Sequence, residues 1–543
     1  MPKRKDHHQM IIGKRYTSER ITPPYDAVVI GSGIGGMTTA AILSRLGNKV
    51  LVLEQHYTAG GFTHTFTHKG YEFDVGLHYV GEMGSQSSPL KRIFDFITHK
   101  QLKWHRTTDV YDRFFFKDDM YEFVAGKSRF QKRMIRYFPY EKKAITQYLG
   151  LLNEINMLTP PYFMEKAMPT WVAPFLNTFM RPLAAKYFEQ TTKTVLNHLT
   201  SNQQLISVLT GQMGTYGLPP SKASFGIHAL VAHHFLDGAY FPIGGSSRIA
   251  ETIEPVIEKS GGAMLTRAKV DQILIRNGRV CGVKLENGDE IESKNVVSSI
   301  GVMNTFGSLI SKEFEQPDMD QALKKLSPSC GHICLFIGLN ESAESLGLKQ
   351  TNIWVYPDYD HDNNYARSLS DGPDFIPGAF ISFPSTKDPE WNSRYPGKST
   401  IQIISFAPYD WFKKWENTGW KKRGDDYEAL KQQLTENLLD ILYQHVPKVK
   451  NKIDYMSLST PLTTRHFCNY QQGEIYGLEH TPERFQQRAL RASTSIKGLY
   501  LSGQDVVACG IAGATITGAM TAAAMTGPLF KDQILRKILG YPS

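Results

Sequence analysis

The chain has 543 residues, of which 41% are hydrophobic and 21% are charged, a balance typical of globular proteins. This length predicts two or three lobes rather than one core. The five cysteines are an odd number spread over the whole sequence, which excludes a disulfide framework and favours a reducing compartment.

The first 24 residues are basic and polar. They contain no apolar stretch of the kind found in a secretory signal, and the acidic Asp6 and Glu19 argue against a transit peptide. We therefore predict a flexible basic arm over residues 1–24 and a cytoplasmic protein.

A strand, a helix and a second strand are predicted next, over residues 25–30, 37–46 and 50–53. The turn between the first strand and the helix is rich in glycine. Its first glycine permits a tight turn, the second lets the backbone approach a pyrophosphate, and the last allows the helix to pack closely on the strand. The phosphates would bind free N–H groups at the helix N-terminus. The turn consists of Gly31, Ser32, Gly33, Ile34, Gly35 and Gly36.

Glu54 supports the dinucleotide-binding interpretation of this turn. It stands directly after the second strand, about 20 residues beyond the glycines, where an acid binds the ribose hydroxyls. A glycine-rich turn alone would be a weak signal, but the turn, the strand and the acid together predict a bound dinucleotide.

The middle of the chain alternates between helical and strand-rich stretches. Residues 139–239 are predicted to be mostly helical. Residues 263–297 are predicted to form short strands, with hairpin turns at Asn277-Gly278 and Asn287-Gly288. Further strands are expected over 332–339, 399–406 and 499–502, and a further helix over 427–445.

Residues 506–530 carry no charge and are long enough to cross a bilayer. They are rich in Gly, Ala and Thr rather than Leu, Ile and Phe, which favours a helix lying close to a ligand or a neighbouring backbone over a membrane span.

Dinucleotide-binding patterns therefore stand at both ends of the chain. This arrangement predicts an α/β fold in which distant segments assemble one Rossmann-like nucleotide-binding domain, with an α+β substrate domain inserted between them. We expect the nucleotide-binding domain, which the resemblance described next implies to be FAD-binding, over residues 25–110, 240–305 and 485–530. The substrate region is expected over 111–239 and 306–484.

Several segments resemble flavoproteins of the amine oxidase and phytoene desaturase superfamily. They are the Gly60-Gly61 pair, residues 73–79, residues 240–248, and residues 498–505 with the following 510–515. The resemblance implies that the glycine pair touches the pyrophosphate, that the 73–79 strand passes the isoalloxazine ring, and that the last helix directs its positive N-terminus at the flavin. Phe62 stands where many members have Arg, so the pyrophosphate would be held by backbone groups or another side chain.

The resemblance also implies a set of FAD-binding residues outside the first turn. Val270 would lie where this branch passes its backbone along the adenine, and Asp505 would meet the ribityl or phosphate region. The expected set is Glu54, Gln55, Gly60, Gly61, Phe62, Thr63, His78, Val270, Gly503, Asp505, Ile511, Ala512 and Thr515.

Five segments are similar to the retinol saturase family more specifically. They are residues 62–66, 76–81, 216–221, 383–389 and 501–505. The similarity implies non-covalent FAD and saturation of one double bond in a long conjugated polyene, a hydrophobic substrate. Vertebrate members begin with a hydrophobic leader that the first residues here do not contain, so we expect a microbial relative. A carotenoid isomerase or desaturase, or a non-catalytic flavin-binding redox protein, would need the same scaffold and stays an alternative.

Saturation needs a hydride on one carbon and a proton on its neighbour. By their place in the motifs, His64, His78, Tyr79 and His228 are the candidate catalytic proton donors, although each could instead be a hydrogen-bonding core residue. No metal site is expected, because the neighbours His233 and His234 would point to different faces of a helix and Cys330 and Cys334 have no second pair.

The expected binding partners are inferred from the net charge and from the absence of a second dinucleotide-binding motif. The net charge of +9, with basic and aromatic residues mixed over 127–143 and 168–199, favours peripheral contact with an anionic membrane. We expect no nucleic-acid partner. No second glycine fingerprint follows the first, so electrons would come from a visiting NAD(P)H or from a protein partner.

Overall fold

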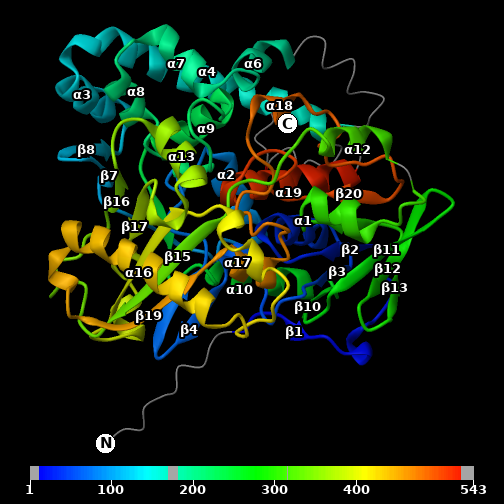
Figure 1. Ribbon diagram of the computed structural model, residues 1–543. Coiled ribbons are helices and arrows are strands. Elements are labelled where there is room, and N and C mark those ends of the chain that lie inside the picture. Colours follow the sequence, from blue (N-terminus) through cyan, green and yellow to red (C-terminus); the bar gives the residue numbers. More distant parts are fainter. Residues whose placement is uncertain (1–10, 169–180, 315, 527–537, 539–543) are drawn as a thin grey trace, which may run out of the picture.

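The computed structural model describes residues 11–168, 181–314, 316–526 and 538. Figure 1 shows a six-stranded sheet beside the first and last long helices, a second large sheet on the opposite side, and a layer of helices above that second sheet. These parts follow the predicted division into a Rossmann-like region and an inserted α+β region.

The six-stranded sheet is parallel throughout and has the order β1-β10-β3-β2-β14-β20. Its strands come from both ends and the middle of the chain, so the predicted assembly from distant segments is confirmed. Because helices cover a parallel sheet on its faces, its strands are largely apolar and buried, except for the exposed edge strand β1. The strands are β1 (Lys14–Arg15), β2 (Ala27–Ile30), β3 (Val50–Leu53), β10 (Ala263–Thr266), β14 (Val296–Ser298) and β20 (Leu499–Leu501).

Two helices from opposite ends of the chain pack closely beside this sheet: α1 (Ile34–Arg45) and α19 (Gly510–Thr526). A Cβ atom on Gly518 would lie 2.5 Å from the carbonyl oxygen of Gly35, so only glycine permits this approach. Thr39 Oγ1 donates to the carbonyl of Gly518 at 3.0 Å. Among the helices that the structure describes, none is long and apolar enough to cross a membrane.

The second sheet has seven strands in the order β19-β15-β18-β17-β16-β7-β8, with one parallel pair, β16 and β7. Leu434, Leu438 and Leu442 of α16 (Asp425–His445) cover one face. The other face forms a wall of the cavity described below. The strands are β7 (Val110–Phe116), β8 (Asp119–Val124), β15 (His332–Leu339), β16 (Asn352–Tyr356), β17 (Ala379–Ser382), β18 (Ser399–Phe406) and β19 (Ile453–Ser459).

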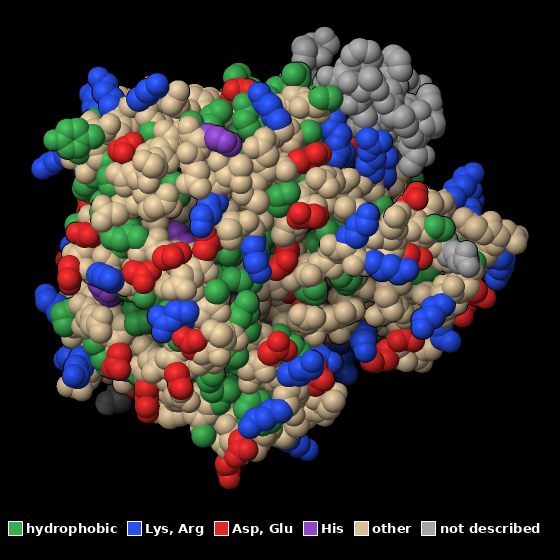
Figure 2. Space-filling view, turned by 45° about the horizontal axis from the view of Figure 1, so that its top comes forward, with side chains coloured by type: hydrophobic (Ala, Val, Ile, Leu, Met, Phe, Trp, Pro, Cys, Tyr) green, Lys and Arg blue, Asp and Glu red, His purple; other side chains and the backbone are tan. Residues whose placement is uncertain are grey.

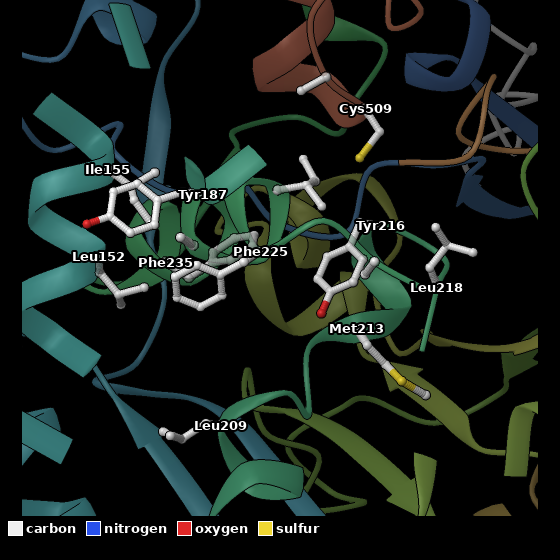
Figure 3. Packing of buried hydrophobic residues seen from close by; sticks show 14 of the residues in the cluster. Leu152, Ile155, Tyr187, Leu209, Met213, Tyr216, Leu218, Phe225, Phe235 and Cys509 are labelled. Carbon is white, nitrogen blue, oxygen red and sulfur yellow. The ribbon is translucent and has the colours of Figure 1, made fainter. Parts of the chain in front are cut away.

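The helical layer confirms the prediction for residues 139–239 within the part described. Leu152 and Ile155 of α4 join Tyr187, Phe225 and Phe235 in one buried cluster, and Figure 3 shows these side chains beside one another. The helices are α3 (Lys127–Tyr137), α4 (Lys142–Met164), α6 (Arg181–Phe188), α7 (Thr192–Leu199), α8 (Gln203–Leu209) and α9 (Phe225–Phe235).

Smaller elements complete the fold. Both predicted hairpin turns are confirmed, because they join β11 (Val270–Arg276), β12 (Arg279–Leu285) and β13 (Glu290–Glu292). The other strands and α-helices are β4 (Thr65–His68) paired with β5 (Tyr71–Asp74), β6 (Trp104–Arg106) paired with β9 (Tyr240–Pro242), and the helices α2 (Pro89–Ile97), α10 (Arg248–Glu258), α11 (Val302–Asn304), α12 (Pro317–Leu323), α13 (His361–Ser370), α14 (Pro384–Lys387), α15 (Trp391–Arg394), α17 (Pro461–Cys468) and α18 (Pro482–Gln486).

The prediction of a flexible arm over residues 1–24 is wrong from residue 11 onward. Lys14 and Arg15 pair with β10 at the edge of the parallel sheet, and the Ile12 side chain is 3% exposed in the core. A two-residue edge strand leaves almost no hydrophobic pattern in a sequence, so composition alone suggested an arm. Residues 1–10 lie outside the described residues, as do 169–180 of the predicted membrane-contacting stretch.

Candidate active site

The glycine-rich turn has the geometry of a phosphate cradle. Gly31 has a φ of +91°, and a Cβ atom on Gly36 would lie 2.4 Å from the Gly31 carbonyl oxygen. A Cβ atom on Gly35 would lie 2.8 Å from the backbone of Gly503. A Cβ atom on Gly33, however, would meet nothing within 4 Å, and Gly33 lines the cavity. The turn is therefore tightly packed on its inner side and open at the N-terminus of α1.

Glu54 is hydrogen-bonded to this glycine-rich turn and does not line the cavity. Its Oε2 accepts hydrogen bonds from the backbone N–H and the hydroxyl of Ser32, at 2.9 and 2.6 Å, and its Oε1 accepts from the N–H of His56 at 2.8 Å. The Ser32 hydroxyl oxygen in turn accepts from the N–H of Gly60 at 3.1 Å. Glu54 thus links the first glycine turn to the glycine pair, a role that the ribose-binding prediction does not include.

The glycine pair, Gly60 and Gly61, packs closely against the first glycine-rich turn. Gly60 and Gly61 have φ values of +123° and +53°, and a Cβ atom on Gly61 would lie 3.0 Å from Cα of Gly33. Thr63 Oγ1 donates to the Gly60 carbonyl at 2.8 Å. The Phe62 ring stacks on Tyr470 with centroids 6.2 Å apart, and both rings line the cavity.

One cavity of about 690 Å³ runs from this cradle into the substrate region. Its size is that of a typical cofactor or ligand site. The dinucleotide end is lined by the two glycine loops, residues 75–80 and the N-terminus of α19. The other end is mostly apolar. It is lined by Phe163 and Met164 of α4, Leu230 and Val231 of α9, and Phe380, Ile404 and Phe406 of the seven-stranded sheet. Leu90 and Ile93 of α2, which packs against α1 and α19, also line the cavity.

The C-terminal motif, residues 498–505 and 510–515, has some residues in the cavity lining and others that contact nearby loops. Gly503, Ile511 and Ala512 line the cavity. Asp505 does not: its two carboxylate oxygens accept from the N–H groups of Val302 and Leu478, each at 2.9 Å. Asp505 is 4% exposed, so it holds two loops together at this end of the cavity.

Other residues expected at the cofactor also lie outside the cavity lining, among them Val270, Gln55 and Thr515. Val270 is 7% exposed in a separate apolar cluster, and Gln55 Nε2 donates to the Phe467 carbonyl at 3.3 Å. The Thr515 hydroxyl is buried inside α19 without a hydrogen-bond partner among the described residues. Their roles toward FAD stay predictions.

Two of the four candidate catalytic residues, His78 and Tyr79, line the cavity. The Tyr79 hydroxyl donates to Oδ2 of Asp112 at 3.0 Å. Burial lowers the pKa of His78 to about 3, and the nearby Lys387 and His332 add to this shift, so the imidazole is neutral at physiological pH.

The other two candidates do not line the cavity. His64 lies behind the glycine pair, where its Nδ1 is 2.6 Å from the Gly61 carbonyl oxygen. His228 is 2% exposed in the helical layer, and its ring nitrogens contact the hydroxyls of Tyr148 and Tyr216 at 3.0 and 3.2 Å. Both geometries correspond to the alternative of a hydrogen-bonding core residue.

A buried polar network supports His78 and Tyr79 from outside the cavity. Lys387 is fully buried, and its Nζ donates to the His78 carbonyl at 3.0 Å, to Ser382 Oγ at 2.8 Å and to Asn352 Oδ1. Asn352 Nδ2 donates to Asp112 Oδ1 at 2.9 Å. Burial lowers the pKa of Lys387 to about 7 and raises that of Asp112. In the sequence, Lys387 stands in residues 383–389, a segment similar to the retinol saturase family, and nothing in that segment distinguished it as a functional residue.

Among the described residues, no group of three or more His, Cys, Asp or Glu side chains could hold a metal ion. Burial raises the pKa of the Cys330 and Cys334 thiols, as expected for thiols packed in a protein interior.

The residues of the cradle fit a flavin dinucleotide. Free N–H groups at the N-terminus of α1 and the open space at Gly33 suit a pyrophosphate. The N-terminus of α19 also opens onto the cavity, and its partial positive charge suits an electron-rich ring edge.

Residues 34–526 match the family model for flavin containing amine oxidoreductase. The all-trans-retinol 13,14-reductase of Danio rerio is 38% identical to this chain over 535 residues, with 94% of the chain and 87% of the relative covered. The chain belongs to the all-trans-retinol 13,14-reductase family. A member from the same organism that is named as inactive is 35% identical over 538 residues, with the same coverage.

These matches confirm three predictions made from the sequence: the all-trans-retinol 13,14-reductase family, the enzyme class and the flavin cofactor. Cyclohexylamine oxidase from Brevibacterium oxydans has the same fold, with a TM-score of 0.59, 16% identity, and coverage of 95% of this chain and all of that one. A microbial origin for this member of the all-trans-retinol 13,14-reductase family stays a prediction.

Proposed function

We propose that the chain is an FAD-dependent oxidoreductase that saturates one double bond of a long conjugated polyene alcohol of the retinol class. The observation that carries the proposal is that one cavity joins the glycine-rich cradle to an apolar end. A polyene is long, apolar and uncharged along its length, and the apolar end is walled by the aliphatic and aromatic side chains of α4, α9 and the seven-stranded sheet.

When bound in reduced form, FAD supplies the hydride. The chain's own residues exclude water from the apolar end and position the polyene. Tyr79 is the best placed proton donor among the four candidates, because its ring lines the cavity and its hydroxyl is linked to Asp112. Burial raises the pKa of the Asp112 carboxyl, which makes it a better proton acceptor than an exposed aspartate.

The electron donor and the membrane contact belong to the same proposal. A visiting NAD(P)H or a protein partner would reduce the FAD. Tyr140 is 99% exposed beside Lys142 and Lys143, which suits peripheral contact with anionic lipid. Figure 2 shows basic and acidic side chains interspersed over the visible face, so this contact would be weak and sensitive to salt.

The test is anaerobic. The bound flavin is reduced, all-trans-retinol is added, and flavin absorbance and extracted products are followed together. Flavin reoxidation with a dihydro-product is expected. Reduced flavin that stays reduced would contradict the proposal and favour a non-catalytic flavin protein. A changed double-bond geometry without net reduction would favour an isomerase. A new double bond formed by oxidised protein from a dihydro-polyene would favour a desaturase.

A pair of variants links this activity to the cavity. Leu230→Trp would fill the apolar end, because Leu230 of α9 lines it, and we expect flavin to be retained but polyene-dependent reoxidation to be lost. Leu183→Trp places the same side chain on α6, where Leu183 is 56% exposed, and should leave reoxidation unchanged. Equal activity of the two variants would show that the polyene binds elsewhere.

A further inference from the structure

His332 is a buried polar residue that the sequence did not single out. It begins β15, is 8% exposed and lines the cavity. Within the part of the chain that the structure describes, neither of its ring nitrogens has a hydrogen-bond partner, and its Nδ1 is completely shielded. His78 lines the same cavity and is unpartnered in the same way.

Other buried histidines of the chain have partners. His228 contacts two tyrosine hydroxyls, His361 Nε2 lies 3.0 Å from the Ser207 carbonyl oxygen, and His480 Nε2 accepts from the N–H of Cys509 at 2.9 Å. A buried polar group without a partner costs about 1–3 kcal/mol. His233 Nδ1 is also buried without a partner, but His233 does not line the cavity. Among the histidines that the structure describes, His332 and His78 are therefore set apart by being both unpartnered and at the cavity wall. There a ligand can hydrogen-bond Nε2, which is not completely shielded as Nδ1 is.

The two imidazoles belong to the same region of the cavity wall. His332 pairs with Phe406 of β18, and β18 pairs in turn with β17, which carries Phe380. The His78 ring packs against Phe380 with centroids 5.4 Å apart. Phe380 lies two strand spacings of about 4.8 Å from His332 and is offset by two residues along the strands, so the two residues lie roughly 12 Å apart across the wall.

Both rings are neutral. Burial lowers the pKa of His332 to about 4 and that of His78 to about 3. A neutral imidazole has one N–H donor and one acceptor, which matches a hydroxyl group. A carboxylate would bring an unpaired charge into an apolar cavity, since the nearby Lys387 ammonium already donates to three protein oxygens.

We propose that His332 is a specificity-determining residue that hydrogen-bonds the hydroxyl end group of the polyene, with His78 facing the same end of the substrate. This inference rests on the proposed function and names the end group that the site accepts. In retinol the hydroxyl-bearing carbon adjoins the 13,14 double bond. A hydroxyl held at His332 therefore keeps that bond within a few ångströms of His332, in the cavity that His78 also lines.

The test compares three ligands on the FAD-loaded protein: all-trans-retinol, the hydrocarbon that lacks only its hydroxyl, and retinoic acid. Dissociation constants are measured from changes in flavin absorbance. His332→Phe should weaken retinol binding roughly tenfold and leave the hydrocarbon unchanged, since about 1.4 kcal/mol is lost with the hydrogen bond. His332→Asn should restore part of the preference. Retinoic acid should bind weakly to the wild type.

Phe406→Leu is the matched control, because Phe406 lies opposite His332 in the strand pair and lines the cavity without a polar group. It should weaken retinol and the hydrocarbon equally. Flavin content and thermal unfolding identify any variant that fails to fold. Equal binding of retinol and hydrocarbon by the wild type, or an equal loss in His332→Phe, would overturn the role of His332 and leave polyene reduction standing. A wild type that neither binds nor reduces any polyene would overturn both.

Discussion

The Ser32 hydroxyl donates a hydrogen bond to Oε2 of Glu54 at 2.6 Å, and both side chains are buried. The same Ser32 oxygen accepts from the N–H of Gly60. One serine therefore fixes the first glycine turn, the acid after β3 and the glycine pair relative to one another. Preorganised loops bind a dinucleotide more tightly, because less ordering remains to be done on binding.

Ser32→Ala should weaken FAD binding without unfolding the protein. The variant leaves Glu54 Oε2 with only the backbone N–H of Ser32 and leaves the N–H of Gly60 without its partner. A loss of about 1–3 kcal/mol corresponds to roughly 5- to 150-fold in the dissociation constant. Titration of the apoprotein with FAD measures it, and Ser87→Ala, an exposed site, is the control. Unchanged affinity would mean that the loops are held by other contacts.

Gly33→Val should give a folded protein without flavin. A Cβ atom there meets no protein atom within 4 Å, and the φ of −60° and ψ of 163° are accessible to valine, so the side chain fits. It would occupy the space beside the N–H groups where a pyrophosphate must approach. Absorbance at flavin wavelengths and circular dichroism measure the two outcomes separately.

Gly150→Ala is the matched control, since Gly150 lies exposed in α4 with open space at its Cβ position. It should keep full flavin content. Full occupancy in Gly33→Val would show that the phosphates do not bind at this turn.

The sequence predicted the parallel sheet well because its signals are local. Residues 31–36 combine glycines with a flanking strand and helix, and β3 coincides with the predicted residues 50–53. The strands β7, β8, β16 and β17 of the second sheet were not predicted. The pairing of β16 with β7 joins residues 240 positions apart, Asn352 and Asp112, which no local period reveals. The pairing of β7 with β8 is a local hairpin that the sequence analysis missed.

The site was predicted less completely for the same reason. His78 and Tyr79 were found through a motif, whereas His332 opens an ordinary apolar strand and becomes a cavity residue only through the register of β15 with β18. His228 shows the reverse case: its motif position suggested catalysis, but Tyr148, 80 residues earlier in the chain, contacts it as a core partner. Burial and partners of this kind are properties of the fold rather than of a short segment.

Lys387→Met should destabilise the protein by about 1–3 kcal/mol. Removing Nζ leaves the carbonyl of His78, Asn352 Oδ1 and Ser382 Oγ without their buried donor. Urea unfolding followed by circular dichroism measures the change. Lys349→Met, at an exposed position nearby in the sequence, should change the free energy of unfolding by less than about 0.5 kcal/mol. Similar values for the two variants would mean that the network contributes nothing to stability.

The protein should lose stability on mild acidification because several histidines are buried as neutral groups. Burial lowers the pKa of His64 and His332 to about 4 and that of His78 and His228 to about 3. The unfolded chain, with a histidine pKa near 6.5, binds more protons than the folded one below that pH. The free energy of unfolding therefore falls as pH drops from about 6.5 toward the folded pKa values, by about 1.4 kcal/mol per pH unit for each such histidine.

His228→Phe isolates one of these contributions. Asp74, whose pKa burial raises to about 6, stabilises the folded state as pH falls and partly masks the total, so a difference between variants is the better measure. At pH 7 the variant should be less stable than the wild type by about 1–3 kcal/mol, because Tyr148 and Tyr216 lose their shared partner. Below pH 6 the gap should close by about 1.4 kcal/mol per pH unit. Parallel curves of unfolding free energy against pH would show that His228 is not held neutral in the fold.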